Sequence, residues 1–407
     1  MKVSLTLFVA CAFLNFACTA QHIDVNKIRQ HIKILASDSL EGRGTGTAGE
    51  KLAIAYIQDQ FKKLGLEAKG EKGLYTQKFS FKSGVHGTGN EGISYNIVGF
   101  LDNKAANTII IGAHYDHLGL GMEGSSLQAN SQGIIHNGAD DNASGSAGVI
   151  ELARYFKNNN VKEKNNFLFI CFSGEELGLY GSKYFTENPT IDFSKANFMI
   201  NMDMIGRLDQ KNGITVSGSG TAPGWENLLK KLSTTEVPIK TDSSGTGPSD
   251  HTSFYLKNMP VLHFFTGSHP DYHKPSDDWD KINYEGEAKV LETIIKLIES
   301  VDKEPKLAFL TTKSKSMGGT RSSFKVTMGV MPSYSSTEEG LKIDGVSDGK
   351  AAAKAGLKTG DVIIQMGDLK IKNIEDYMGA LGKFEKGQTI DVVVKRNGET
   401  VTLPVTF

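Results

Sequence analysis

Four short apolar segments, each of strand length and bounded by polar residues, constrain the fold of this chain most strongly. Continuous apolar runs of this kind are typical of strands buried on both faces of a sheet. Between them lie amphipathic stretches whose apolar residues recur at helical spacing. Strands that alternate with helices predict an α/β domain with a mostly parallel (mixed) central sheet flanked by helices on both faces. The strand segments are 107–113, 166–172, 197–202 and 260–265, and the predicted helices are 47–64, 143–157, 177–186, 225–232 and 284–301.

Charge and composition narrow the function classes. The 407 residues include 45 Lys and Arg against 46 Asp and Glu, which gives a formal net charge of -1. Nucleic-acid-binding proteins usually carry a basic excess, so no nucleic-acid partner is expected. Glycine is abundant, with 45 residues. Many glycines indicate many sharp loops, which is a common trait of enzymes whose sites are built on loops.

The first twenty residues are typical of a targeting segment. A Lys at position 2 precedes an almost wholly apolar run over 3–17, and a small-residue site ends at Ala20. This pattern predicts a signal peptide at 1–20. Lipidation of Cys18 and a buried N-terminal helix are the alternatives. We therefore expect an exported protein that is periplasmic, outer-membrane-associated or secreted, with no transmembrane segment.

The sequence pattern changes after residue 302. Residues 302–321 are rich in Lys, Ser, Thr and Gly and predict a linker between one domain at 21–301 and another at 322–407. The second domain reads as β-rich. Its predicted strands are 324–330, 341–346, 361–366, 390–396 and 401–407.

Residues with metal-binding chemistry follow the predicted parallel strands. His114 and Asp116 end the first strand and face the same side, because residues two apart in an extended chain do so. The carboxyl ends of parallel strands are where α/β sheets build ligand sites. Each candidate alone has a structural explanation as a polar strand end or a helix cap. Together, two histidines and several carboxylates suit Zn²⁺, and more than four candidates favour two metals. The candidates are His114, Asp116, Asp140, Asp141, Glu175, Glu176, Asp203 and His273.

These candidates lie in five ordered motifs, which are His114-Tyr-Asp116, Gly138-Ala-Asp-Asp141, Gly174-Glu-Glu176, Asn201-Met-Asp203 and Tyr272-His273. In this order the motifs resemble those of the co-catalytic zinc aminopeptidases, the group that contains bacterial leucyl aminopeptidase, aminopeptidase Y and glutamate carboxypeptidase. The resemblance implies two Zn²⁺ ions per chain. His114 and Asp203 would bind one zinc, Glu176 and His273 the other, and Asp140 would bridge them. Residues 35–43 also resemble an entry segment of the same group.

The resemblance also implies an activity, which is removal of N-terminal residues from peptide substrates by a metal-bridged water. Glu175 would be the general base, and Asp116 would orient His114. Tyr272 keeps two roles open, as a donor to the oxyanion or as an aromatic wall. Asp250 is expected to be structural or to cap a helix. No role is assigned to His117, His136, His263 or His269.

Other functions stay open on the same fold. One is dipeptidase or carboxypeptidase specificity. Another is a glutaminyl-cyclase-like transferase with a single zinc, although the presence of both His114 and Asp203 argues against it. A third hypothesis is a peptide-binding scaffold in which the C-terminal domain is the working part.

The C-terminal domain resembles a PDZ domain. Residues 355–364 carry the resemblance, which makes 327–330 the candidate loop for a peptide carboxylate and 374–384 the helix beside the groove. PDZ domains bind chain ends by adding a strand to a sheet edge. The expected partner is a peptide C-terminus or a regulatory protein, and the alternative is a rigid accessory domain.

Overall fold

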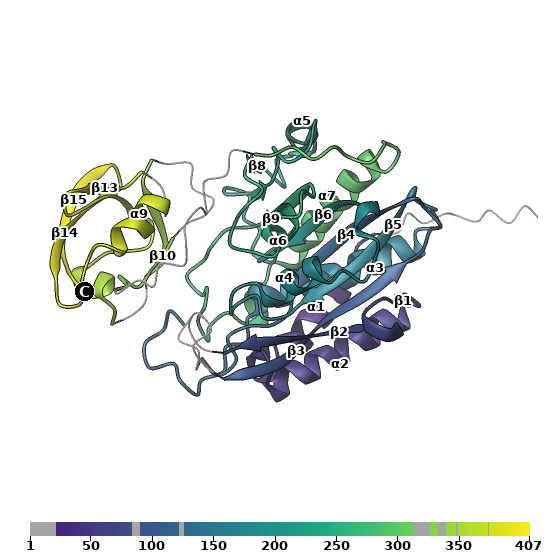
Figure 1. Cartoon of the computed structure of the whole chain (residues 1–407), viewed down its shortest axis with the longest axis horizontal. Helices are drawn as coiled ribbons and strands as arrows, with labels where there is room; N and C mark the ends of the chain where they lie inside the picture. Colours follow the sequence, from purple (N-terminus) through teal and green to yellow (C-terminus); the bar gives the residue numbers. More distant parts are fainter. Residues whose placement is uncertain are drawn as a thin grey trace, which may run out of the picture.

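The computed structural model describes residues 22–83, 90–121, 126–312, 326–332, 339–346, 349–372 and 374–407. The predicted signal peptide (1–20) with Cys18, and the second half of the predicted linker, lie outside these residues. The described chain forms two bodies with separate hydrophobic cores (Figure 1). No helix in these ranges is both long and apolar enough to cross a membrane.

The first body alternates helices and strands much as the sequence predicts. Its helices are α1 (Val25–Leu35), α2 (Ala48–Lys63), α3 (Gly145–Asn158), α4 (Tyr180–Glu187), α5 (Trp225–Leu232), α6 (His251–Tyr255) and α7 (Tyr284–Val301), with a short helical segment, η4 (Ala139–Ser144), before α3. Its strands are β1 (Glu67–Ala68), β2 (Thr76–Lys82), β3 (Glu91–Leu101), β4 (Asn107–His114), β5 (Asn165–Phe172), β6 (Ala196–Met202), β7 (Ile214–Ser217), β8 (Ile239–Asp242) and β9 (Val261–Phe265).

The strands form one mixed sheet in the order β1-β3-β5-β4-β6-β9-β7-β8, with β2 paired to β3. The central strands β5, β4, β6 and β9 are mutually parallel. Strand β3 joins β5 antiparallel, and β7 joins β9 antiparallel. The predicted mostly parallel, mixed sheet is confirmed. Since the four central strands run the same way, their carboxyl ends meet at one edge.

Alternate residues of β5 point into two different cores. Phe167 and Phe169 belong to the larger core, where α1, α2, α3, α5 and α7 contribute. Leu168 and Ile170 belong to the smaller core on the opposite face, with Phe254 of α6 and residues of α4. Both faces of the strand are buried, which is why the sequence shows a continuous apolar run. Helices on both faces of the sheet are confirmed (Figure 1).

Residues 303–312, which the sequence analysis assigns to the linker, lie on the first body. The backbone N–H of Leu307 donates to Oδ1 of Asn197 (2.8 Å). Farther along, the N–H of Thr312 donates to the hydroxyl of Tyr255 in α6 (3.0 Å), and Thr312 is buried. We call residues 303–312 the tail segment. The tail segment follows α7 and reaches α6, to which Thr312 is hydrogen-bonded.

The tail segment should therefore stabilise the first body. A chain that ends at Asp302 should melt roughly 5 °C or more below one that ends at Thr312, because several hydrogen bonds and the packing of Phe309 on Tyr255 are lost. Thermal unfolding of the two truncated chains measures the difference. Equal melting temperatures would show that the tail segment is only a tether.

The second body is a small antiparallel sheet with two helices. Its predicted strands agree with the structure except the first, since residues 326–329 are not strand and β10 begins at Val330. Gly329 has a φ of 73°, in the left-handed region, and this conformation interrupts an extended run. The elements are β10 (Val330–Pro332), β11 (Leu341–Val346), α8 (Ala351–Ala355), β12 (Val362–Met366), β13 (Leu369–Lys370), α9 (Ile374–Leu381), β14 (Thr389–Arg396) and β15 (Glu399–Thr406).

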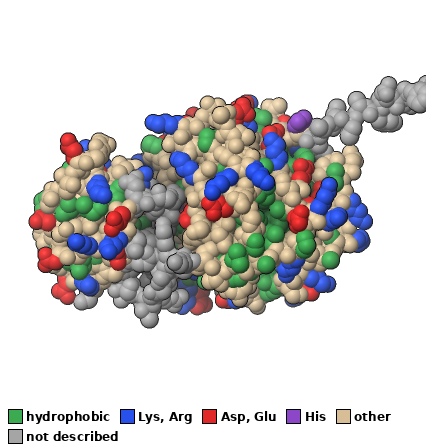
Figure 2. Space-filling model, turned by 90° about the horizontal axis from the view of Figure 1, so that it is seen from above, with side chains coloured by type: hydrophobic (Ala, Val, Ile, Leu, Met, Phe, Trp, Pro, Cys, Tyr) green, Lys and Arg blue, Asp and Glu red, His purple; other side chains and the backbone are tan. Residues whose placement is uncertain are grey.

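Acidic and basic side chains are mixed over the surface. On the face that Figure 2 shows, Lys and Arg side chains are interspersed with Asp and Glu over both bodies. In contrast, carboxylates that the sequence places near the strand ends, such as Asp116 and Asp141, are buried inside the first body.

Candidate metal centre

The end of β4 holds a buried histidine in a defined orientation. The Nδ1–H of His114 donates to the backbone carbonyl of Asp116 (3.1 Å). Since Nδ1 is taken up by this hydrogen bond, Nε2 is the nitrogen that faces Oδ1 of Asp141 and Oδ1 of Asp203, each at 3.4 Å. An imidazole held by its second nitrogen in this way is oriented to bind a metal ion.

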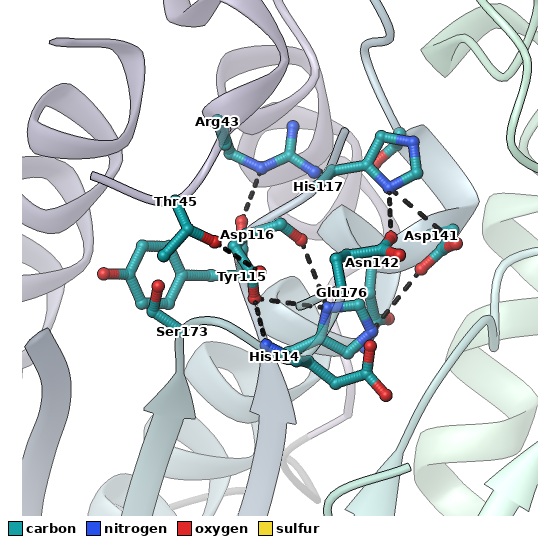
Figure 3. A network of polar contacts seen from close by, with 12 residues as sticks. Arg43, Thr45, His114, Tyr115, Asp116, His117, Asp141, Asn142, Ser173 and Glu176 are labelled. Atoms are coloured by element: carbon teal, nitrogen blue, oxygen red, sulfur yellow. Dashed lines mark hydrogen bonds and ion pairs between the residues drawn. The ribbon is translucent and has the colours of Figure 1, made fainter. Parts of the chain in front are cut away.

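The carboxylate of Asp116 lies beside this histidine and also contacts the segments of Glu175 and Thr45. Its Oδ1 is 3.7 Å from Nδ1 of His114 and accepts a hydrogen bond from the backbone N–H of Glu175 (3.2 Å). Its Oδ2 accepts from the hydroxyl of Thr45 (2.9 Å) (Figure 3). Asp116 thus ties β4 to the loop after β5, and its backbone carbonyl is a nearer acceptor for Nδ1 of His114 than its carboxylate is.

A second cluster surrounds Glu176. The Nε2 atom of His273 lies 3.3 Å from Oε2 of Glu176 and 3.2 Å from Oδ2 of Asp141. On the other side, Nδ1 of His117 lies 2.8 Å from Oε1 of Glu176 and 3.7 Å from Oδ2 of Asp141. The two oxygens of Asp141 therefore face different clusters, one toward His114 and the other toward Glu176.

The prediction that Asp140 bridges two metals is wrong, because Asp141 occupies that position. The carboxylate of Asp140 points elsewhere: Oδ1 accepts from the backbone N–H of Gly206 (2.7 Å), and Oδ2 lies 3.1 Å from Nε2 of His269. Adjacent residues in η4 project in different directions, so only one of the pair reaches the clusters. The sequence shows two neighbouring carboxylates and contains no signal that selects between them.

His117 is the residue that sequence reasoning missed. It follows His114 by three residues and lies in the same loop, so its closeness to the first motif was the available signal. Its ring stands edge-on to that of His273, with centroids 5.8 Å apart. Burial lowers the pKa of His117 to about 3, which keeps the ring neutral and able to act as a ligand.

The two adjacent glutamates have opposite electrostatic environments. Burial, together with Glu176 and Asp203, raises the pKa of Glu175 well above its usual range. Burial also opposes ionisation of Glu176, but His273 and His117 outweigh it and hold the pKa of Glu176 well below its usual range. Titratable neighbours whose pKa values are pushed apart typically divide into a proton-transfer group and a charged group.

The shared aspartate needs a positive charge. Burial first, and then Glu176, raises the pKa of Asp141 to about 7. An anionic carboxylate is stable at such a position when a cation lies beside it. The buried carboxylates of Asp141 and Glu176 therefore favour a bound cation between them.

A buried arginine holds the loops around the site. The guanidinium of Arg43 donates to four backbone carbonyls, and no part of the residue is exposed. Burial lowers the pKa of Arg43 to about 10, so it remains charged at neutral pH. The acceptors are the carbonyls of Leu35 and Asn137 at 2.6 Å, Tyr115 at 2.7 Å and Gly138 at 2.9 Å. The entry segment that the sequence singled out thus supports the loops of His114 and Asp141.

A second buried carboxylate, Glu50 of α2, supports the loop before Glu175. It accepts hydrogen bonds from the hydroxyls of Ser94 and Ser173 and from the backbone N–H of Gly46. Burial nevertheless raises the pKa of Glu50 from 4.5 to about 7.

This shift makes stability depend on pH. A raised pKa means that the folded chain keeps a proton that the unfolded chain has released, so the contribution of Glu50 is complete below pH 4.5 and is lost as the pH rises through about 7. For metal-free protein, the stability of Glu50→Gln relative to the parent should rise by about 3 kcal/mol over this window. Denaturant unfolding at pH 5 and pH 8 measures it. Glu67→Gln, at an exposed position on β1, is the control and should show no such trend.

Two further residues singled out in the sequence lie in the same region. The ring of Tyr272 stacks on that of His273, with centroids 4.0 Å apart. Asp250 precedes α6 but makes no capping hydrogen bond with its side chain, so the helix-capping interpretation is wrong. Its carboxylate is fully buried, and His251 beside it stacks on His263 at 4.4 Å.

The donor set fits two zinc ions. One group joins His114, Asp141 and Asp203, and the other joins His117, Asp141 and Glu176, with ligand atoms within 4.8 Å of one another in each group. Imidazole and carboxylate are the usual non-thiol ligands of Zn²⁺. A mixed α/β sheet that presents two such groups around one shared aspartate defines the class as a dinuclear zinc enzyme.

Comparison with known proteins identifies the family. Residues 96–298 match the model of peptidase family M28, and residues 326–407 match the PDZ domain. The chain belongs to peptidase family M28 and carries a C-terminal PDZ domain.

Individual relatives agree with this assignment. The leupeptin-inactivating enzyme 1 of Streptomyces exfoliatus is 28% identical over 63% of this chain and 52% of its own length. Aminopeptidase YwaD of Bacillus subtilis is 28% identical over 52% of this chain and 46% of its own. The chain thus spans about half the length of these curated relatives. A Zn-dependent exopeptidase from Parabacteroides distasonis shares the fold, with a TM-score of 0.57 and 16% identity over 69% of this chain and 99% of that one.

Proposed function

We propose that this chain is a zinc-dependent aminopeptidase that removes N-terminal residues from peptides. The observation that carries the proposal is the position of Asp141, whose two oxygens face two separate groups of histidine and carboxylate. Membership of family M28 supports peptide hydrolysis, and the names of relatives such as aminopeptidase YwaD support action at the N-terminus.

Each candidate ligand has a place in this proposal. His114 and Asp203 would hold one ion, and Glu176 and His273 would hold the other, with Asp141 shared by both groups. His117 lies beside Glu176 and is either a further ligand or an orienting group for that carboxylate.

Proton transfer falls to Glu175. Two zinc ions held here would supply Lewis acidity, which would polarise the scissile carbonyl and make water more acidic. Glu175 interacts electrostatically with His114 and Asp203 of one group and with Glu176 of the other, and its raised pKa suits a residue that accepts a proton. It takes the proton from the attacking water and delivers it to the leaving amine. Asp116 keeps the Glu175 loop in place by accepting its backbone N–H.

The test is a panel of substrates with free and blocked N-termini. Purified protein from Gln21 to Phe407 should hydrolyse aminoacyl-nitroanilides and free peptides, lose activity with a chelator and regain it with Zn²⁺. N-acetylated versions of the same substrates should not react. Hydrolysis of the acetylated peptides from the C-terminus would assign carboxypeptidase activity instead. Cyclisation of N-terminal glutamine by protein that holds one zinc per chain would assign the transferase reaction.

We also propose that the PDZ domain binds a peptide C-terminus. The support is that β10 forms the end of its sheet, directly after the 326–329 segment, and a sheet edge accepts an added strand. Titration of the domain with a fluorescent library of C-terminal peptides tests this. Binding that is unchanged when the peptide C-termini are amidated would contradict carboxylate recognition.

A further inference from the structure

A fully buried aspartate, Asp277, lies behind the segment that carries the shared ligand. Its Oδ2 accepts hydrogen bonds from the backbone N–H groups of Asp140 (2.9 Å) and Asp141 (3.0 Å). Its backbone carbonyl accepts from the N–H of Ala139 (3.1 Å). Three consecutive amides of η4 therefore donate to a single residue that is more than 130 positions away in sequence.

Arg207 holds the other oxygen of this aspartate. Its Nη2 lies 3.2 Å from Oδ1 of Asp277 and 3.3 Å from Oδ2 of Asp271. Arg207 follows the ligand Asp203 by four residues, and Asp277 follows the ligand His273 by four. The pair thus joins three loops, and each of these loops carries one of the proposed ligands.

The backbone at Asp141 explains why such support is needed. Its φ of -107° and ψ of 93° are not helical, so a regular helix does not hold this residue. Its carboxylate must nevertheless keep Oδ1 near His114 and Oδ2 near His273, at 3.4 Å and 3.2 Å from their Nε2 atoms. A fixed hydrogen bond to the Asp141 amide removes one of the motions that would turn the carboxylate away from one group.

We propose that Asp277 is a positioning residue that orients Asp141 and thereby sets the spacing of the two metal ions, with Arg207 holding Asp277 in place. This inference rests on the proposed dinuclear function. It assigns to the segment after His273 a role in arranging the metal pair that is separate from ligation.

The experiment compares the Asp277→Ala and Asp277→Asn variants with the parent protein, all as the full-length chain. Asparagine keeps an oxygen that can accept from both amides, whereas alanine keeps none. Asp271→Asn is the matched control. Asp271 contacts the same arginine, but the hydrogen bonds to the η4 amides of Asp140 and Asp141 are made by Asp277. Zinc binding is measured by titrating metal-free protein against a competing chelator, and the distance between ions is followed by the spin coupling of Mn²⁺-loaded protein.

Asp277→Ala should bind the second ion roughly 10- to 100-fold more weakly and lose most of the spin coupling. Asp277→Asn keeps the acceptor for both amides but turns an NH₂ group toward Arg207, so it should lie between the parent and Asp277→Ala in both properties. Asp271→Asn should resemble the parent. A folded Asp277→Ala variant that binds two ions with parental affinity and coupling would overturn the inference. If that variant does not fold, Arg207→Gln decides, with roughly tenfold weaker second-ion binding expected and parental binding contradicting the inference.

These readouts separate the inference from the function on which it rests. If the parent chain itself binds fewer than two ions, the dinuclear proposal fails. If the parent binds two ions and Asp277→Ala binds them equally well, only the role of Asp277 fails.

Discussion

Replacing Glu175 with glutamine should lower kcat by roughly 10²- to 10⁴-fold while both metal ions remain bound. The side chain interacts electrostatically with His114, Asp203 and Glu176, and the backbone N–H that fixes its loop to Asp116 is unchanged by the substitution. Glutamine has nearly the same shape but cannot take a proton from water. Initial rates on an aminoacyl-nitroanilide, together with zinc analysis of the same sample, measure both parts of this expectation.

The neighbouring Glu176→Gln variant is the matched control. Its carboxylate is within 2.8 Å of His117 and 3.3 Å of His273, so its loss should remove metal as well as activity. The contrast of a zinc-replete inactive variant with a zinc-depleted one distinguishes the two roles. A Glu175→Gln enzyme with parental kcat would eliminate Glu175 as the general base.

Replacing Asp141 with asparagine should abolish metal-pair binding, with a larger loss of zinc affinity than the roughly 10- to 100-fold that removal of an outer partner costs. Both oxygens of Asp141 face histidine nitrogens at the site, and a neutral amide supplies only one acceptor to the two groups. Zinc stoichiometry after dialysis measures the effect, and activity should fall with it.

The Asp140→Asn variant tests whether Asp140 or Asp141 is the ligand shared by the two metal ions. Its amide oxygen can still accept from the N–H of Gly206, and its NH₂ group can face His269, so the local contacts survive. We expect two bound zinc ions in this variant. If instead Asp140→Asn lost the metal pair and Asp141→Asn kept it, the bridging position inferred from the structure would be refuted.

Among the strands of the first body, those that could be predicted from the sequence are buried along almost their whole length. Strands β4, β5, β6 and β9 are buried along both faces, which leaves a continuous apolar run as their signal. Strand β2 alternates buried and exposed residues, so a period-two pattern was available for it and was missed. Strands β7 and β8 span four residues each, which is too short for a clear pattern. Helix α6 is too short to show a period.

The candidate site divides in the same way. His114, Glu176 and Asp203 follow strands that the sequence reveals, and parallel strands bring their carboxyl ends together. Asp141 could not be separated from Asp140, because the choice depends on how η4 turns its side chains. His117 and Asp277 act through contacts between loops, which leave no periodic pattern in the sequence.

Arg43 makes the metal centre depend on contacts between distant parts of the chain. Its acceptor carbonyls on Tyr115, Asn137 and Gly138 are 72 to 95 residues away in sequence, and a fourth belongs to Leu35 at the end of α1. The two ligand loops consequently depend on the N-terminal segment for these hydrogen bonds. The stretch that matches the family model, 96–298, lacks both Arg43 and α1, so we expect a fragment limited to this stretch to hold the two ions more weakly than one that begins at α1.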